Sequence, residues 1–313
     1  MYRIGIDLGG TNIAIGLVTD DGVLIRKDSI PTNVRQTGEA LAEDMAEFTA
    51  RFLEAQHIGQ EAVRSIGIGC PGVSDNEKGL LLLTVNLPFK NTNIREIFLR
   101  RFPQPVQLAN DANCAALAEV RAGAAKGYQT SITITLGTGV GGGIIIDGKI
   151  YTGFNFAAGE LGHMVIHTGG ELCGCGRKGC LEAYASATAL IRETKKAAQR
   201  HPESLIHQLC EGDLNKINAK TAFDAKRAGD PTGIQLVENF TIDLAEGLIS
   251  YINIFQPEII LIGGGISKEG EYLLAPLREY VFRYAYGNDF LPRTRIEKAV
   301  LGNDAGIIGA AML

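Results

Sequence analysis

The chain has 313 residues, of which 45% are hydrophobic and 21% are charged, a balance typical of a soluble globular protein. Its net charge of −5 argues against a broad nucleic-acid-binding surface, because such surfaces are strongly basic. The first residues lack the charged and apolar regions of a signal peptide, and no apolar run reaches the length of a membrane span. We therefore expect a cytoplasmic protein with no nucleic-acid or membrane partner and with two domains.

The same pattern of strand, Gly/Thr turn, strand, Asp-Gly turn and strand occurs twice, offset by about 126 to 128 positions. The first copy begins with a strand over residues 2–8, and the second begins with a strand over residues 132–136. This internal duplication predicts two similar lobes, each with a hairpin whose Gly/Thr tip can approach an anion closely. We place the smaller N-terminal lobe at residues 1–110, joined by the C-terminal helix 303–313, and the larger lobe at residues 111–302.

Helices and further strands alternate along the rest of the chain, which predicts an α/β protein with mixed sheets. The expected helices cover residues 36–57, 94–101, 111–123, 183–200, 203–210, 221–228, 232–255, 271–286 and 305–313. The further expected strands cover residues 63–70, 105–109, 258–262 and 295–298. Residues 80–92 are expected to form a loop with turns.

The first Gly/Thr tip carries groups suited to binding phosphate. The backbone N–H groups of its glycines and the hydroxyl of Thr11 can donate to phosphate oxygens, and Asp7 can hold magnesium directly or through water. A glycine hairpin with a surface carboxylate is the alternative, and the tip alone does not choose between the two.

Two later glycine clusters extend this candidate site. Residues 137–142 satisfy G-x-G-x-x-G, but a strand follows them where a dinucleotide site needs a helix, so we reject that interpretation. A Walker A loop is also excluded, because no Lys-Ser/Thr pair follows any of the clusters. Residues 263–265 either bind the sugar and base of a nucleotide or simply begin a helix. The candidate ATP-binding residues are Asp7, Gly9, Gly10, Thr11, Gly137, Thr138, Gly139, Gly141, Gly263, Gly264 and Gly265.

Asn110 and Asp111 stand where a predicted strand ends and a predicted helix begins. An Asp at such a position is often only a helix N-cap. The functional interpretation makes Asp111 a general base, which removes the proton of a sugar hydroxyl as its oxygen attacks the γ-phosphate in line. The spacing leaves both interpretations open.

The Gly-rich residues 160–182 contain a candidate metal site. Cys173, Cys175 and Cys180, with His163 before them, form a Cys3His set suited to tetrahedral zinc. Four protein ligands leave no open position for water, so such a zinc is structural. A disulfide with a spare thiol, or buried apolar cysteines, are the alternatives. We favour zinc because Cys-x-Cys is poorly shaped for a disulfide.

The same segment offers polar groups for a ligand. Glu160, His163 and Glu182 would be held in fixed geometry, and carboxylates with an imidazole suit the hydroxyl edge of a sugar. One ring nitrogen of His163 can bind zinc while the other donates outward. The two glutamates can equally be solvated charges.

Eight segments, in order across almost the whole chain, resemble the ROK family in its bacterial glucokinase-like branch. They read I-D-L-G-G-T, G-I-G-C-P-G-V, N-L-P-F-K-N, A-N-D-A-N-C-A-A-L-A-E, T-L-G-T-G-V-G-G-G, G-E-L-G-H-M, C-G-C-G-R-K-G-C-L-E and P-E-I-I-L-I-G-G-G-I. The resemblance implies the two-lobed, duplicated actin/hexokinase-like (ribonuclease H-like) fold with a structural zinc site. It makes Asp111 the catalytic base and Asn110, Glu160, His163 and Glu182 sugar contacts, with Gly72 and Asn86 in segments that line the sugar pocket.

The activity that this resemblance implies is ATP-dependent phosphorylation of a hexose, commonly at the 6-hydroxyl, with Mg²⁺ accompanying ATP. Glucose is the expected sugar, and N-acetylglucosamine, N-acetylmannosamine, fructose and allose remain alternatives. A non-catalytic sugar-sensing regulator is the rival class. ROK repressors carry a helix-turn-helix segment before the first strand, whereas this chain starts at that strand, so we expect no DNA-binding role. We also expect a homodimer or a homotetramer.

Overall fold

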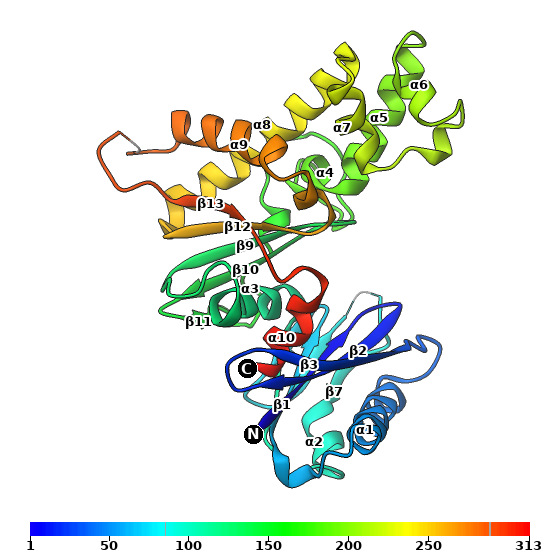
Figure 1. Cartoon of the computed structure of the whole chain (residues 1–313), viewed down its shortest axis with the longest axis vertical. Helices are drawn as coiled ribbons and strands as arrows, with labels where there is room; N and C mark the ends of the chain where they lie inside the picture. The colour runs from blue at the N-terminus through cyan, green and yellow to red at the C-terminus, as the bar shows by residue number, and fades with distance from the viewer. Residues whose placement is uncertain (85, 288) are drawn as a thin grey trace. The chain divides into compact units, whose positions relative to one another are not determined.

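The computed structural model describes residues 1–84, 86–287 and 289–313. It contains two compact units (Figure 1). Unit 1 comprises Met1–Thr133, Gly143–Gly159 and Val300–Leu313, and unit 2 comprises Ile134–Gly142 and Glu160–Ala299. The two lobes predicted from the sequence, residues 1–110 with 303–313 and residues 111–302, divide the chain differently from these two units. The lobe boundaries stay a prediction.

Among the described residues, the larger sheet within unit 1 has five strands in the order β3-β2-β1-β4-β8. The strands are β1 (Tyr2–Leu8), β2 (Asn12–Thr19), β3 (Leu24–Pro31), β4 (Val63–Cys70) and β8 (Val106–Asn110). Strands β1, β4 and β8 run parallel, with Asp7 opposite Gly69 and Cys70 opposite Asn110. Because the carboxyl ends of parallel strands meet at one edge of a sheet, this register brings Asp7 and Asn110 to the same edge.

The α-helices of unit 1 in the part of the chain that the structure describes are α1 (Gly38–Ala55), α2 (Ile94–Leu99), α3 (Asp111–Ala122) and α10 (Ala305–Ala311). Helix α10 lies directly on strands β1 and β4, where glycines permit the approach. A Cβ on Gly5 would lie 1.9 Å from the carbonyl oxygen of Ile307, and a Cβ on Gly67 would lie 1.7 Å from that of Ala310. The same helix packs against α3, so the C-terminal segment supports the helix that begins with Asp111.

The loop with turns that the sequence predicts over residues 80–92 is present at residues 84 and 86–89, but strands flank it at both ends. They are β6 (Leu80–Leu83) and β7 (Lys90–Asn93), which pair in a small antiparallel sheet of order β5-β6-β7 with β5 (Val73–Asp75). Leu81 and Thr92 lie opposite each other and are both buried. The sequence does not predict the two flanking strands because tertiary burial stabilises them, and because the leucines of β6 show no alternation of polar and apolar residues.

A second five-stranded sheet has the order β11-β10-β9-β12-β13. Its strands are β9 (Ser131–Leu136), β10 (Val140–Ile146), β11 (Lys149–Ile150), β12 (Ile259–Gly263) and β13 (Arg295–Lys298). The boundary between the units falls within β9 and β10. The order repeats that of the first sheet, with β10 and β11 antiparallel like β2 and β3, and β12 and β13 parallel like β4 and β8.

The described residues of unit 2 form the α-helices α4 (Glu182–Ala185), α5 (Ala187–Arg200), α6 (Ile206–Leu209), α7 (Ala219–Arg227), α8 (Pro231–Phe255) and α9 (Glu271–Tyr284). Helix α8 starts as predicted, with Pro231 in its first turn after the N-cap Asp230. The helix predicted over 183–200 is interrupted at Ser186, whose extended backbone and hydroxyl cap α5. The helix predicted over 203–210 is reduced to α6. Short 3₁₀ turns occur at η1 (Gln60–Ala62), η2 (Leu161–His163), η3 (Leu214–Lys216), η4 (Gly265–Glu269) and η5 (Gly302–Asp304). In the described residues, every helix is too short or too polar to span a membrane.

Candidate active site

Two carboxylates in unit 1 influence each other electrostatically. Asp7 lies near the end of β1, and Asp111 is the first residue of α3, directly after β8. Burial, and secondarily the charge of Asp111, raises the pKa of Asp7 to about 6. Desolvation also raises the pKa of Asp111, although a hydrogen bond from the Ala112 amide to Oδ1, at 2.9 Å, opposes the shift. Asp111 still has solvent-accessible surface, so it combines access with raised basicity, as a general base requires.

The N-cap of α3 is Asn110. Its Oδ1 accepts from the amides of Ala112 at 2.9 Å and Asn113 at 3.2 Å. Its Nδ2 donates to the carbonyl oxygen of Gly72 at 3.2 Å, which ties the end of β8 to the turn after β4. The capping role that the sequence left open for Asp111 therefore belongs mainly to its neighbour.

The turn at Gly72 requires glycine. Its φ is +92°, and a Cβ there would lie 2.1 Å from the carbonyl oxygen of Leu83. Asn86 is an exposed residue between β6 and β7. Next to it, the hydroxyl of Thr84 donates to the carbonyl oxygen of Leu87 at 2.6 Å and shapes the loop. Gly72 is thus linked directly to Asn110, whereas Asn86 stands in the neighbouring loop.

The first Gly/Thr tip connects β1 to β2 and is braced by Thr32. The Thr32 hydroxyl donates to the carbonyl oxygen of Gly9 at 2.7 Å, and its amide donates to that of Thr11 at 2.8 Å. The amide of Gly9 is bonded to the Asn12 carbonyl oxygen at 2.9 Å. Gly10 and Thr11 are exposed and therefore accessible to a ligand. No sequence signal marks the role of Thr32, since it follows an edge strand as an ordinary polar residue.

The second Gly/Thr tip, residues 137–139, connects β9 to β10, and a segment remote in sequence holds it. The amide of Ala187 donates to the carbonyl oxygen of Gly137 at 2.9 Å, and the Thr188 hydroxyl donates to that of Thr138 at 2.7 Å. Gly141 lies further along β10 and is partly buried. Sequence reasoning missed Ala187 and Thr188, because their part in the site depends wholly on this tertiary contact.

The glycine cluster 263–265 ends β12 and begins η4. Gly264 has a φ of +80°, and a Cβ there would lie 2.4 Å from the carbonyl oxygen of Leu136, so the cluster abuts the strand that leads to the second tip. The start of a helix, one of the two alternatives from the sequence, is present as a 3₁₀ turn. A role in nucleotide binding stays a prediction.

A cavity of about 500 Å³ adjoins this cluster in unit 2. Its lining comprises Ala219, Lys220, Phe223, Asp224, Arg227, Gly265, Ile266, Lys268 and Glu269. The guanidinium of Arg227 lies 4.7 Å from the centroid of the Tyr272 ring and forms an ion pair with Glu269. The aromatic ring of Phe223 and the planar guanidinium of Arg227, together with the charged side chains of the lining, suit a heterocyclic ligand with polar substituents.

The four predicted metal ligands come together. One ligand atom each from His163, Cys173, Cys175 and Cys180 lies within 4.8 Å of the others. Cys173 Sγ is 3.5 Å from His163 Nδ1, and Cys175 Sγ is 3.7 Å from Cys180 Sγ. Tetrahedral zinc with ordinary bond lengths separates sulfur from nitrogen by about 3.6 Å and two sulfurs by about 3.8 Å. The cluster therefore fits zinc, and the sulfur separation is far too long for a disulfide.

His163 has its two ring nitrogens turned to different partners. Nδ1 faces Cys173, while Nε2 is 4.0 Å from Oε2 of Glu160. Glu160 is exposed and His163 is partly exposed. The ring can therefore bind a metal through one nitrogen while the other stays near the Glu160 carboxylate.

Glu182 makes contacts that the sequence does not predict. Its Oε1 lies 3.3 Å from Cys173 Sγ, and its Oε2 accepts from the amide of Val140 at 3.0 Å. Val140 is the first residue of β10, directly after the second Gly/Thr tip. Within unit 2, Glu182 thus joins the Cys3His cluster to the tip.

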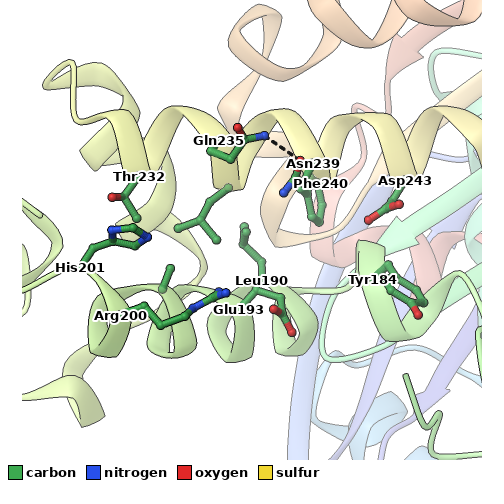
Figure 2. Close-up of a pocket in the computed structure, with 12 residues that line it drawn as sticks. Tyr184, Leu190, Glu193, Arg200, His201, Thr232, Gln235, Asn239, Phe240 and Asp243 are labelled. Carbon is green, nitrogen blue, oxygen red and sulfur yellow. Dashed lines mark hydrogen bonds between the residues drawn. The ribbon is translucent and has the colours of Figure 1, made fainter. Parts of the chain in front are cut away.

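A separate cavity of about 270 Å³ lies between α5 and α8 (Figure 2). Its lining comprises Tyr184, Leu190, Glu193, Ala197, Arg200, His201, Thr232, Gln235, Leu236, Asn239, Phe240 and Asp243. None of the predicted catalytic, sugar, nucleotide or metal residues is among them. This cavity is distinct from the predicted site.

The mixed α/β sheets match the architecture of ROK kinase structures. The chain belongs to the ROK family, since the family's sequence profile matches residues 3–313. A glucokinase of Thermotoga maritima is 40% identical over 311 residues, covering 99% of this chain and 96% of the relative. Among solved structures, a ROK family glucokinase from Streptomyces griseus in complex with glucose and AMPPNP has a TM-score of 0.81 at 35% identity, covering 99% of this chain and 98% of the other. A ROK hexokinase from Thermus thermophilus has a TM-score of 0.82, also at 35% identity, over 100% of this chain and 97% of the other.

Regulators are also among the relatives. A xylose repressor of Caldicellulosiruptor bescii is 30% identical over 306 residues, which cover 98% of this chain and 76% of the repressor. Membership of the family is therefore compatible with either catalysis or regulation.

Proposed function

We propose that the chain is an ATP-dependent hexose kinase, a phosphotransferase with an alcohol acceptor, that converts glucose to glucose 6-phosphate. The observation that carries this proposal is the full-length similarity to glucokinases, which reaches 40% identity. The carboxylate of Asp111 also supports the proposal, because it is accessible and its raised pKa suits a general base.

Asp111 is the proposed general base. A hydroxyl oxygen becomes a competent nucleophile for the γ-phosphate as a carboxylate takes up its proton in the transition state. Desolvation makes that carboxylate a stronger base than a solvated one, and the Asn110 cap fixes the start of the helix that carries it. The proposed sugar contacts are Asn110, Glu160, His163, Glu182, Gly72 and Asn86.

The two Gly/Thr tips and the 263–265 cluster are the proposed ATP-binding elements. The backbone amides and hydroxyls of the tips donate to phosphate oxygens, and the cavity beside Gly265 accepts the nucleoside. Magnesium accompanies ATP and neutralises charge on the phosphates, and Asp7 is the carboxylate placed to hold it.

The proposed metal in unit 2 is a structural zinc ion held by His163 through Nδ1 and by Cys173, Cys175 and Cys180. The spacing of the four ligand atoms supports this choice. All four positions are then filled by protein, so the metal fixes Glu160, His163 and Glu182 rather than activating water.

The finer architecture that we propose is the two-lobed, duplicated actin/hexokinase-like (ribonuclease H-like) fold, supported by the repeated strand order of the two sheets. We further propose a cytoplasmic homodimer or homotetramer without nucleic-acid or membrane partners.

A sugar-sensing regulator is the second candidate, favoured by the similarity to a xylose repressor. An ADP-coupled assay over glucose, N-acetylglucosamine, N-acetylmannosamine, fructose and allose separates the two functions. We expect sugar-dependent ADP formation, highest with glucose. Binding of a hexose without ADP formation would instead identify a regulator, and a different preferred hexose would correct the substrate.

A further inference from the structure

A short stretch that follows the Cys3His cluster holds the second Gly/Thr tip. Residues 182–188, here called the connecting segment, form three hydrogen bonds with the hairpin, at residues 137, 138 and 140. Glu182 accepts from the Val140 amide, and the Ala187 amide and the Thr188 hydroxyl donate to the carbonyl oxygens of residues 137 and 138. The backbone of the tip is thus fixed from one side by a single segment.

The fit between this segment and the tip is tight at Gly139. A Cβ at that position would lie 2.3 Å from Oε2 of Glu182. The φ of Gly139 is outside the left-handed region, so a larger residue there would not strain the backbone but would displace the Glu182 carboxylate. The carboxylate therefore packs against the tip as well as bonding next to it.

The other side of the connecting segment is fixed to the residues around the Cys3His cluster. Oε1 of Glu182 lies 3.3 Å from Cys173 Sγ, and the Tyr184 hydroxyl accepts from the Glu171 amide at 2.7 Å. Close by, a Cβ on Gly162 would lie 2.2 Å from the carbonyl oxygen of Val140, so the turn before His163 packs on the same strand.

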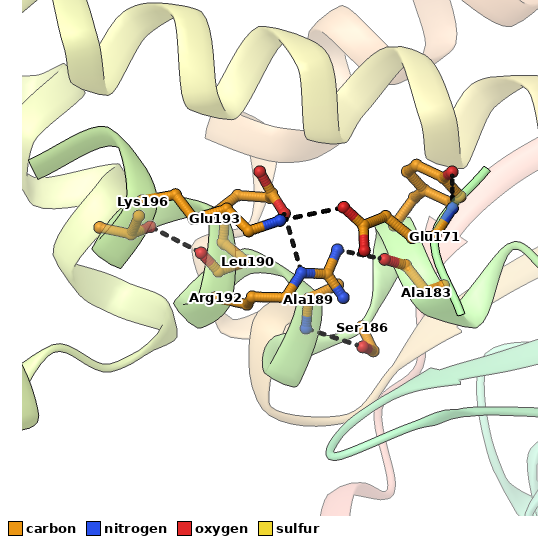
Figure 3. Close-up of polar contacts among 10 residues, drawn as sticks. Glu171, Ala183, Ser186, Ala189, Leu190, Arg192, Glu193 and Lys196 are labelled. Atoms are coloured by element: carbon orange, nitrogen blue, oxygen red, sulfur yellow. Dashed lines mark hydrogen bonds and ion pairs between the residues drawn. The ribbon is translucent and has the colours of Figure 1, made fainter. Parts of the chain in front are cut away.

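Helix α5 strengthens this connection (Figure 3). Lys196 donates to the Glu171 carboxylate at 2.9 Å, and Arg192 donates to the carbonyl oxygen of Ala183 at 2.7 Å. The helix begins at the Ser186 cap, next to Ala187 and Thr188. Side chains from α5 thus bond back to the cluster region, while its first turn bonds to the tip.

We propose that the connecting segment couples the Cys3His cluster to the second Gly/Thr tip, so that metal occupancy controls nucleotide affinity as well as sugar affinity. Glu182 and Thr188 are the positioning residues. This inference rests on the proposed kinase function, because that function assigns phosphate binding to the tip. It adds a second role to a metal site whose ligands lie outside the tip itself.

The first test is Thr188→Val, which keeps the shape of the side chain but removes the donor to the Thr138 carbonyl oxygen. We expect the Kd of Mg²⁺-AMPPNP, measured by calorimetry, to rise about 3-fold to 10-fold, the loss expected for one hydrogen bond. The glucose Kd should stay unchanged. Thr188→Ser retains the donor and should restore nucleotide affinity. Equal nucleotide affinity in all three proteins would overturn the role of Thr188.

The second test removes the metal with a chelator and follows hydrogen exchange, in which the amide of Val140 reports its bond to Glu182. We expect faster exchange in residues 139–142 together with weaker AMPPNP binding, and restoration of both by added zinc. Residues 63–70 of unit 1 serve as the control for global unfolding. Faster exchange around residues 164–181, with unchanged exchange at Val140 and unchanged AMPPNP affinity, would overturn the coupling.

If chelation unfolds the whole chain, Glu182→Gln in the metal-loaded protein decides the question, since the amide can keep the Val140 bond but not the charge. Faster exchange at Val140 in Glu182→Ala, but not in Glu182→Gln, supports the coupling, and identical exchange in both contradicts it. A wild-type chain that forms no ADP with any hexose would defeat the proposed kinase function. The exchange at Val140 would still report on the coupling separately.

Discussion

Asp7, near the end of β1, and Asp111, directly after β8, lie at the same edge of the first sheet, where burial and secondarily the charge of Asp111 raise the pKa of Asp7. In the part of the chain that the structure describes, no cationic side chain offsets the effect of desolvation on the pKa of either carboxylate. Such an arrangement costs stability, and it is typical of sites that bind a cation or move a proton. The pair should therefore affect both turnover and the pH dependence of stability.

Asp111→Asn should lower turnover by about 100-fold or more, on the scale of removing a general base. The glucose Kd should change little, because the amide keeps the size and much of the hydrogen-bonding capacity of the carboxylate. Steady-state kinetics and calorimetry check the two expectations. Asp21→Asn, in an exposed hairpin turn, is the matched control and should retain wild-type turnover. Turnover near that of the wild type in Asp111→Asn would rule out the assigned role.

Asp7 should make the protein less stable as the pH rises from about 4 to about 6. The ordinary pKa of an aspartate side chain is 3.8, whereas that of Asp7 in the folded chain is about 6, so the folded state binds the proton more tightly. The stabilisation from this group is complete below pH 3.8 and is lost as the pH passes the folded value, and its upper bound is about 3 kcal/mol.

Asp7→Asn should therefore unfold at a higher temperature than the wild type at pH 7.5, with the difference vanishing near pH 4. Thermal unfolding followed by circular dichroism, without Mg²⁺ or nucleotide, measures this. Asp21→Asn again provides the control, with no comparable gain. An Asp7→Asn variant no more stable than the wild type at pH 7.5 would contradict the argument. The same variant should lose activity if Asp7 holds magnesium.

The parts of the fold with strong local patterns were predictable from the sequence. The repeated hairpins have alternating strands and Asp-Gly turns, and α8 has both an Asp cap and a proline in its first turn. The interruption at Ser186 was not predictable by periodicity, since the residues on either side of it are good helix formers. It depends on the tertiary bonds of the next two residues to the second tip.

The residues of the candidate site were likewise predictable from the sequence only in part. The Cys3His ligands carry recognisable chemistry in a recognisable spacing, whereas the position of Asp111 left a helix cap and a general base equally open and only the family resemblance favoured the base. Thr32 and Thr188 are ordinary threonines, and only the folded chain shows that they brace the two Gly/Thr tips. Asn110 was expected to contact sugar, and its capping bonds emerged only from the geometry of α3.

Removal of zinc should weaken sugar binding. The residues between Glu160 and Glu182 form a 3₁₀ turn and isolated β-bridges rather than a regular helix or strand, so we expect the metal ligands to contribute to their order. We expect one zinc per chain by elemental analysis and a glucose Kd raised by about 10-fold to 100-fold in the chelated protein or in Cys175→Ser. Cys210→Ser, outside the cluster, should keep both the zinc and the affinity. Metal-free protein with unchanged glucose affinity would exclude this role of the metal.

Glu119 should be among the most important polar residues for the stability of unit 1. It is 1% exposed, and its carboxylate accepts from the amides of Val300 and Leu301 at 2.9 Å each and from that of Ala124 at 2.8 Å. These bonds fix the start of the C-terminal segment whose helix α10 covers β1 and β4. Glu119→Ala leaves three partly buried amide hydrogen bonds without their acceptor, so we expect a loss of about 3 to 5 kcal/mol in the free energy of unfolding.

Denaturant unfolding followed by circular dichroism measures that loss, and Glu96→Ala, an exposed glutamate on α2, should cost less than about 1 kcal/mol. Hydrogen exchange in Ala305–Ala311 should increase in Glu119→Ala before that of β12 changes, because α10 depends directly on the anchored segment and β12 belongs to unit 2. Simultaneous loss of protection in both would mean that Glu119 stabilises the whole chain rather than this anchor. A loss no larger than that of Glu96→Ala would contradict the anchoring role altogether.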